Sequence, residues 1–221
     1  MVISLLTLFP QTLIPILNSS ILLRAQKKNL VRFDLVNIRD YSEGKRRTVD
    51  RKPYGGGVGM ILKVDVLVKA IEATIQRYPH IKKNKRKIIL TEAGSALFTQ
   101  KKAKMYSHLD HLILISGHYE GVDARIYHFI DASVSVGKYV VTGGELPILI
   151  IADSVTRLIP NVLNQKSVEM ESYFDGKTKE FPQYTRPPSF RGFPVPPILL
   201  SGNHAQILKW KKEKLKSSNF F

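Results

Sequence analysis

The sequence predicts an α/β fold built on a mostly parallel sheet with helices on both of its faces. Apolar runs of strand length alternate with longer segments in which apolar residues recur at helical spacing. Three segments, 87–95, 111–123 and 134–147, each lead from a strand into a loop that contains glycine. Because the carboxyl ends of parallel strands meet at one edge of a sheet, these loops predict a small-molecule site at that edge.

Strands are expected where a short run is rich in leucine and β-branched residues, and helices where apolar residues recur every three to four positions. In chain order, the expected elements are a strand over 2–9, a helix over 12–26, a strand over 33–38, a loop over 39–59, a helix over 60–78, a strand over 87–90, a helix over 99–107, a strand over 112–116, a helix over 122–130, a strand over 132–141, a helix over 148–159 and a last helix over 204–216.

Particular residues mark several of these boundaries. Pro10 ends the first strand. Lys27 and Lys28 follow the first helix, where positive charge suits the carboxyl end of the helix dipole. The charges and glycines of the segment 39–59 do not suit a packed element, which is why a loop is expected there. Asn203 is placed to cap the last helix.

The composition changes after Pro160, and this change predicts the domain boundaries. Seven of the twelve prolines lie from Pro160 onward, and the following residues show little periodicity. We therefore expect a domain over 1–160, a flexible linker over 161–186 and a short helical segment over 187–221.

The chain is strongly basic, with 34 Lys and Arg against 18 Asp and Glu, a formal net charge of +16 and a pI near 10. Such an excess favours a polyanionic partner, with nucleic acid first and a membrane surface second. General solubility of a lysine-rich protein is the other interpretation. The charge alone leaves both open.

The absence of cysteine excludes disulfides, thiol nucleophiles and thiolate metal sites, and it favours a reducing compartment. The six histidines lack metal-ligand spacing, so no metal site is expected.

Residues 1–23 carry no charged side chain, but Pro10, Pro15 and several polar residues interrupt the apolar run. We therefore expect a cytoplasmic protein that does not enter a membrane.

Two of the glycine loops could hold a ligand, although each could also be a structural turn. In Gly143–Pro147 the two glycines permit close backbone approach, and Pro147 fits the first turn of the helix that follows. We expect that helix to start near Pro147 rather than at a capping box from Thr142 to Glu145. The loop Gly117–Gly121 adds an aromatic ring and a carboxylate to an exposed backbone.

Charged residues outside these loops suggest further roles. Arg157 lies in an apolar helical run, where a charge is either paired or functional. The segment 46–59 combines cations, Tyr54 and several glycines, which suits contacts with the phosphates and bases of RNA. A charged surface loop is the alternative interpretation of that segment.

The order of the motifs carries a resemblance to a known family. The motifs are RTVD at 47–50, PYGGGVGM at 53–60, GHYEGVD at 117–123, VGKYVVTGGELP at 136–147, DSVTRLIP at 153–160, YTRP at 184–187 and LLSGNH at 199–204. Together they resemble the bacterial tRNA (guanine-N1)-methyltransferases that modify guanosine 37. The resemblance implies a SPOUT fold with a deep trefoil knot, S-adenosyl-L-methionine as methyl donor, tRNA as substrate, and a homodimer whose subunits share active sites. It also implies assistance by Mg²⁺, for which the sequence offers no dedicated site.

The resemblance also assigns site residues by matching motifs. The implied cofactor-binding residues are Leu90, Thr91, Gly94, Gly117, Tyr119, Glu120, Gly121, Val136, Gly137, Lys138, Tyr139, Val140, Val141, Gly143, Gly144 and Pro147. The implied RNA-binding residues are Asp50, Tyr54, Gly55 and Gly56. Arg157 takes the position of the family's catalytic arginine.

The general base is assigned less directly, because the family's aspartate is absent here. Counting from Gly176 places Glu171 at its position, whereas counting back from Tyr184 places Ser172 there. We favour Glu171, because a carboxylate keeps the base chemistry and an insertion in a flexible segment costs little.

The expected mechanism is methyl transfer to N1 of guanine, with Glu171 removing the N1 proton and Arg157 stabilising negative charge on the carbonyl oxygen. Two alternative functions are a knotted methyltransferase acting on another RNA position, and an RNA-binding protein of the same fold without catalytic activity.

Overall fold

The computed structural model describes residues 1–164, 171–173 and 180–216. The chain divides into two compact units, Met1–Leu163 and Asn164–Phe221. The linker expected over 161–186 lies partly outside the described residues.

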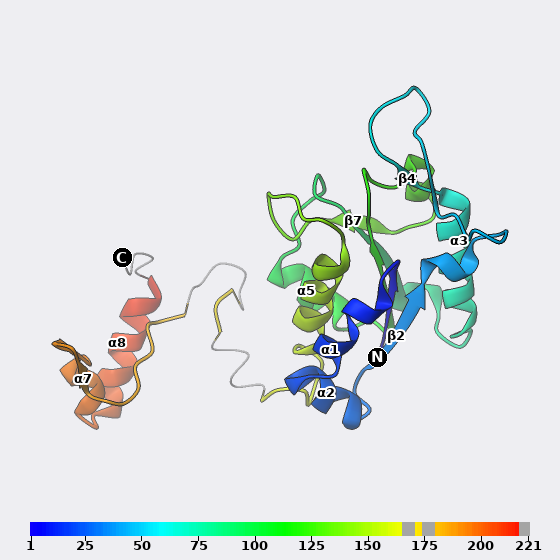
Figure 1. Ribbon diagram of the computed structural model, residues 1–221. Helices are drawn as coiled ribbons and strands as arrows, with labels where there is room; N and C mark the ends of the chain where they lie inside the picture. The colour runs from blue at the N-terminus through cyan, green and yellow to red at the C-terminus, as the bar shows by residue number, and fades with distance from the viewer. Residues whose placement is uncertain (165–170, 174–179, 217–221) are drawn as a thin grey trace. The chain divides into compact units, whose positions relative to one another are not determined.

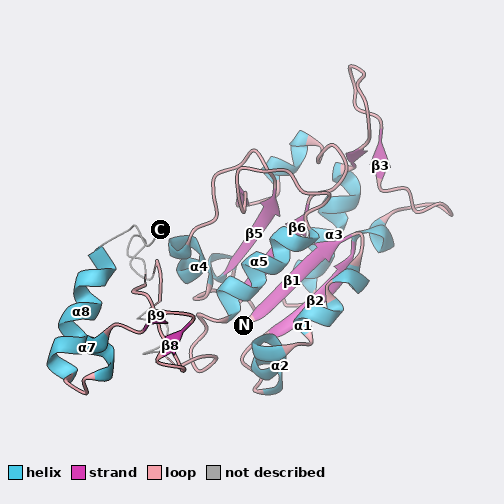
Figure 2. Cartoon of the chain, turned by 60° about the vertical axis from the view of Figure 1, so that its left-hand side comes forward, coloured by secondary structure: helices cyan, strands magenta, loops and turns pink. Residues whose placement is uncertain are grey.

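The first unit is built on a parallel sheet of five strands, in the order β2-β1-β6-β5-β7 (Figures 1 and 2). The strands are β1 (Val2–Thr7), β2 (Arg32–Asn37), β5 (Arg86–Thr91), β6 (His111–Ser116) and β7 (Ala132–Val134). The expected α/β class and parallel sheet are therefore confirmed. β1 and β6 are almost entirely buried, which is why their sequences are apolar without alternation.

Helices cover both faces of the sheet and create two apolar layers (Figure 2). On one face, the first layer packs against α1 (Ile14–Leu17), α2 (Ser20–Lys27), α4 (Gln100–Tyr106) and α5 (Glu145–Thr156). On the other, the second packs against α3 (Val64–Gln76) and the 3₁₀ turns η2 (Ile38–Tyr41) and η4 (Ala124–His128). Two further 3₁₀ turns are η1 (Pro10–Thr12) and η3 (Lys83–Lys85). The loop between β3 (Asp50–Arg51) and β4 (Ile61–Leu62) projects away from these layers (Figure 1).

The second unit contains a short hairpin and two helices in its described part. These elements are β8 (Ser189–Phe190), β9 (Phe193–Pro194), α7 (Pro197–Leu200) and α8 (His204–Lys216). The bounds of α8 match the expected helix. Its expected cap is confirmed too, since the Gln206 amide donates to Asn203 Oδ1 at 3.2 Å.

Several expected elements have different bounds in the structure. The single helix expected over 12–26 is wrong: Ser20 has a φ of 42°, and the chain forms η1, α1 and α2 instead. The helix expected from residue 60 begins at Val64, because Ile61–Leu62 pair with β3. The helix expected over 122–130 is the 3₁₀ turn η4, in which Asp123 Oδ1 accepts from the Arg125 amide at 3.0 Å.

The strand expected over 132–141 ends at Val134, and this early end is the correction that matters most for the site. Val134 is paired with Thr91, the last residue of β5, so β7 has no strand to pair with beyond it. Helix α5 begins at Glu145 rather than near Pro147, with Gly144 as its N-cap. Pro147 is then the third helical residue. The first amide groups of a helix have no partner within it, so the missing N–H of Pro147 costs no helical hydrogen bond.

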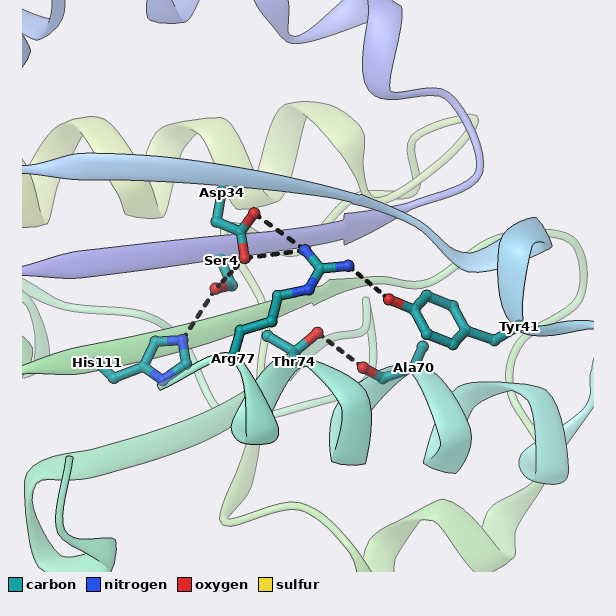
Figure 3. Close-up of polar contacts among 7 residues, drawn as sticks. All are labelled: Ser4, Asp34, Tyr41, Ala70, Thr74, Arg77 and His111. Atoms are coloured by element: carbon teal, nitrogen blue, oxygen red, sulfur yellow. Dashed lines mark hydrogen bonds and ion pairs between the residues drawn. The ribbon is translucent and has the colours of Figure 1, made fainter. Parts of the chain in front are cut away.

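A polar network joins four strands and the carboxyl end of α3 near the amino ends of the strands, and Figure 3 shows the part of it that runs from His111 through Ser4 and Asp34 to Arg77. Arg86 Nε donates to His111 Nδ1 at 3.2 Å, so His111 Nε2 carries the proton and donates to Ser4 Oγ at 2.9 Å. The Ser4 hydroxyl in turn donates to Asp34 Oδ2 at 3.4 Å, and Arg77 holds the same carboxylate at 3.1 and 3.2 Å. Burial, and then the nearby Arg86 guanidinium, lower the pKa of His111 to about 4.

This network makes stability depend on pH through His111. The unfolded imidazole titrates near its ordinary pKa of 6.5 and the folded one near 4. The unfolded chain therefore binds the extra proton in this window, and the free energy of unfolding should fall by about 3 kcal/mol as the pH drops from 7 to 4. Urea unfolding of the wild type and of His111→Gln should be measured across this pH range, and the free energy of unfolding of the variant should lack this fall at low pH. An equal fall in both proteins would contradict the assignment to His111. His108→Gln, at an exposed position, is the control.

Candidate active site

Three strand ends lie level at the carboxyl edge of the sheet. Thr91, at the end of β5, is paired with Ser116 of β6 on one side and with Val134 of β7 on the other. The loops that follow these strands line a cavity of about 290 Å³, and the amino end of α5 forms part of its wall. A pocket at the carboxyl ends of parallel strands is the usual place for a small-molecule site in such a fold.

The floor of the cavity is a close contact between two backbones. The Gly144 amide donates to the Gly117 carbonyl at 2.7 Å, and the Thr91 hydroxyl donates to the Ile115 carbonyl at 3.0 Å. A Cβ at Gly144 would lie 2.6 Å from both the Gly117 nitrogen and Thr91 Oγ1. A Cβ at Gly117 would lie 2.7 Å from the Thr91 carbonyl oxygen. Glycine is required at both positions because backbone or buried atoms fill the space that a side chain needs.

Glu145, the first residue of α5, ties the helix to two strands below this floor. Its Oε1 accepts from Thr7 Oγ1 at 2.7 Å and from Ser116 Oγ at 2.8 Å. A carboxylate at the amino end of a helix is also favoured by the helix dipole. Glu145 was not among the expected site residues, and its two partners lie 138 and 29 positions away in the sequence.

His118 lines the cavity beside Glu145. Its Nδ1 lies 3.7 Å from Glu145 Oε2 and is buried without a hydrogen bond among the described residues. The ring packs against Phe9 at 5.2 Å and against Tyr119 at 4.9 Å between centroids. These aromatic contacts fix the orientation of the imidazole at the cavity wall.

Most of the residues expected to bind a cofactor line this one cavity. They are Leu90, Thr91, Gly94, Gly117, Tyr119, Glu120, Gly121, Val136, Tyr139, Val140, Val141, Gly143, Gly144 and Pro147. Gly137 and Lys138 belong to the same loop but do not line it, and the Gly137 carbonyl instead accepts from Ser135 Oγ at 2.7 Å. The sequence did not single out Glu92, His118 or Ser135 as lining residues. The position of Glu92 directly after an apolar strand is the signal that could have identified it.

The charge of the lining is opposite to the charge of the chain. Glu92 and Glu120 line the cavity, and no lysine or arginine does so among the described residues. Apolar side chains, including Leu90, Val134 and Pro147, provide the rest of the wall. In a chain with a net charge of +16, this arrangement suits a ligand with an apolar face and a positive charge.

The loop that was expected to bind RNA is exposed and is joined to the cavity at its base. Tyr54 is fully exposed, while Gly55 and Gly56 have φ values of 83° with no atom close to where a side chain would stand. Asp50 is half-buried in β3. The loop returns through Met60, whose carbonyl accepts from the Glu120 amide at 3.1 Å. Residues 53–60 are therefore tied by backbone to a loop that lines the cavity.

The two expected catalytic residues belong to different units of the chain. Arg157 is the C-cap of α5 and is half-buried. Glu171 lies in the second unit and is half-buried too. Ser172, the alternative base, has a hydroxyl oxygen that accepts from the Glu180 amide at 2.9 Å. The Ser172 hydroxyl therefore has a structural hydrogen bond within the second unit.

Among residues 1–164, 171–173 and 180–216, no group of three or more His, Asp or Glu is arranged to hold a metal ion. None of the helices formed by these residues is long and apolar enough to cross a membrane.

Comparison with known proteins shows one family. Residues 1–219 match the family model described as tRNA (Guanine-1)-methyltransferase TrmD. The tRNA (guanine-N(1)-)-methyltransferase of Bacillus subtilis is 45% identical over 215 residues, which cover 97% of this chain and 87% of that protein. The proteins of the same name from Bacillus pumilus and Carboxydothermus hydrogenoformans are 46% and 44% identical, over 98% and 97% of this chain and 88% and 82% of their own lengths.

The contact between Gly144 and Gly117 predicts the effect of adding one methyl group. Gly144→Ala should lower the free energy of unfolding by about 2 kcal/mol, because the new Cβ meets backbone on one side and a buried hydroxyl on the other. Gly94→Ala is the matched control, since a Cβ there meets nothing within 4 Å, and it should change stability by less than about 0.5 kcal/mol. Equal unfolding midpoints in urea for both variants would show that the backbone around Gly144 can shift to accommodate a side chain.

Proposed function

This chain belongs to the tRNA (guanine-1)-methyltransferase family, and from that premise we propose that its carboxyl-edge cavity binds S-adenosyl-L-methionine for transfer of a methyl group to tRNA. Its activity is the methylation of N1 of guanosine 37 in tRNA. The observation that carries the assignment to this cavity is its lining, which joins a backbone floor of glycines to an apolar wall and two carboxylates.

The lining fits this methyl donor better than it fits other nucleotide cofactors. The apolar wall suits a purine ring, and the glycine floor lets backbone groups approach the ligand closely. Nicotinamide dinucleotides and nucleoside triphosphates carry phosphates, which two carboxylates without lysine or arginine would repel. S-Adenosylmethionine has no phosphate and supplies a methyl group on a positively charged sulfur.

We assign the proton transfer and the charge stabilisation to two side chains. N1 of neutral guanine carries a proton, so the new N1–carbon bond requires its loss, and Glu171 removes it as general base. Arg157 stabilises the negative charge that grows on the guanine carbonyl oxygen. Glu171 is preferred to Ser172 because a carboxylate accepts a proton readily, while the Ser172 hydroxyl oxygen is held by the Glu180 amide. Mg²⁺ assistance, which the resemblance also implies, has no dedicated site among the described residues.

RNA binding is assigned to the projecting loop and to the basic surface. Asp50, Tyr54, Gly55 and Gly56 contact the anticodon region, where an exposed ring and open backbone can stack on and approach a base. The net charge of +16 attracts RNA phosphates, so affinity should fall steeply with salt. A cytoplasmic location follows from a tRNA substrate.

We further propose the SPOUT-type trefoil knot for the first unit. β5 lies between β6 and β7, so the connection 117–131 must cross β5 to reach β7. The segment 135–144 then returns past the carboxyl end of β5 to reach Gly117 and Thr91. This double passage supports the knotted arrangement that the resemblance implies.

A homodimer with shared active sites completes the proposal. Helix α5 is apolar nearly all round, and Leu146 and Ile150, one turn apart, are 58% and 45% exposed. Val140, in the loop that lines the cavity, is 86% exposed. A second copy covering these side chains would bury apolar surface beside the cavity.

The function is tested by calorimetry and by methyl incorporation. The protein should bind S-adenosylmethionine without RNA and should label a tRNA with guanosine 37, but not the same tRNA with adenosine 37. Labelling of another position would identify a knotted methyltransferase with a different target. RNA binding without binding of the methyl donor would identify an RNA-binding protein without this activity.

Substitution tests the two catalytic assignments separately. Glu171→Gln and Arg157→Ala should each lower the turnover rate by about a hundredfold or more, while calorimetry shows donor binding retained. Ser172→Ala, the matched control, should keep turnover within a few-fold. Turnover that survives Glu171→Gln but is lost in Ser172→Ala would assign the role of general base to Ser172 instead of Glu171. Unchanged turnover in Arg157→Ala would remove that arginine from the mechanism.

The proposed subunit contact can be broken without touching the cavity lining. Ile150→Asp should shift the mass in sedimentation analysis from dimer to monomer and should abolish methyl transfer, because a buried carboxylate opposes the contact. Glu72→Gln, on the exposed side of α3, should leave both unchanged. A monomeric Ile150→Asp variant with full activity would contradict shared active sites.

A further inference from the structure

Glu92 is a cavity-lining carboxylate that the proposed mechanism does not use. It follows β5 directly, and two hydroxyl groups hold it. Tyr127 Oη donates to Glu92 Oε2 at 2.6 Å, and Ser95 Oγ donates to the same oxygen at 2.9 Å. Ser95 Oγ also lies 2.7 Å from Ser133 Oγ, which extends the cluster to β7. Two donors from different elements fix the carboxylate in place before any ligand binds.

This arrangement leaves the negative charge available to a ligand. Both hydroxyl donors contact Oε2, so Oε1 has no hydrogen-bond partner among the described residues. The hydroxyl groups are neutral and do not compensate the charge. No lysine or arginine lines the described cavity. The hydrogen bond to Glu92, and then burial and the negative charge of Glu92, raise the pKa of Tyr127, so the donor stays protonated.

The second carboxylate of the lining has a different environment. A Cβ on Gly59 would overlap the side chain of Glu120, and the Glu120 amide donates to the Met60 carbonyl at 3.1 Å. Glu120 is therefore packed against the base of the projecting loop. Glu92 is instead held by the hydroxyl groups of Ser95 and Tyr127.

We propose that Glu92 is a specificity-determining residue that favours the positively charged methyl donor over its neutral-sulfur product. The inference rests on the proposed function. When the methyl group leaves, the bonding electron pair remains on sulfur, and the sulfonium becomes a neutral thioether. The two ligands otherwise share the adenosine and amino-acid groups. A fixed carboxylate therefore attracts the donor more strongly than the product and aids exchange of one for the other after each turnover.

The test is calorimetry of Glu92→Gln with S-adenosylmethionine and with S-adenosylhomocysteine. The substitution keeps the shape and removes the charge. It should weaken donor binding by about fivefold or more and change product binding by less than about twofold, so that the ratio of the two affinities falls. Tyr127→Phe, which removes one donor from Oε2, should lower this ratio by a smaller factor. Glu72→Gln, an exposed carboxylate on α3, should leave it unchanged.

Other outcomes overturn the proposal. Equal weakening of both ligands would mean that Glu92 accepts a hydrogen bond from a group that they share. Unchanged binding of both would mean that Glu92 has no role toward the ligand. Failure of the proposed function is distinguishable, because the wild-type protein itself would then bind neither compound. Circular dichroism and urea unfolding of each variant identify any that fails to fold.

Discussion

The hydrogen bond from the Gly144 amide to the Gly117 carbonyl is the contact on which the site depends. It brings the chain that leaves β7 back against the end of β6 and begins α5 at the same point. Glu145 then joins this helix to Thr7 of β1 and Ser116 of β6, so three elements meet under the cavity floor. A side chain at Gly144 would separate these backbones, and the cavity above them would lose its floor.

The distribution of charge separates the two binding tasks of the protein. The chain as a whole is positive and suits a polyanion, whereas the described cavity lining contains two carboxylates and no lysine or arginine. RNA phosphates are therefore attracted to the surface but not into the cavity, where a positively charged group is favoured. The bond between the Glu120 amide and the Met60 carbonyl joins the two regions, so that the loop proposed to meet RNA shares its base with the cavity wall.

The sequence was sufficient to predict the parallel sheet and most of the glycine-bearing loops that line the cavity. Apolar runs and glycines are local signals, and the strand ends that they mark lie level in the structure. The ends of elements were less predictable, because partners decide them. The apolar run 132–141 reads as a single strand, but β7 stops at Val134 where β5 ends. Glu92 and Glu145 were missed because hydroxyl groups distant in sequence, such as Tyr127 and Thr7, hold their carboxylates.

Amide hydrogen exchange with and without S-adenosylmethionine tests the location of the donor most directly. We expect the donor to slow exchange in the segments that line the cavity, 91–95, 117–122 and 139–144, and to leave exchange in the network around His111, at the other end of the strands, unchanged. Protection confined to another part of the chain, with these three segments unaffected, would contradict the assignment of this cavity to the methyl donor.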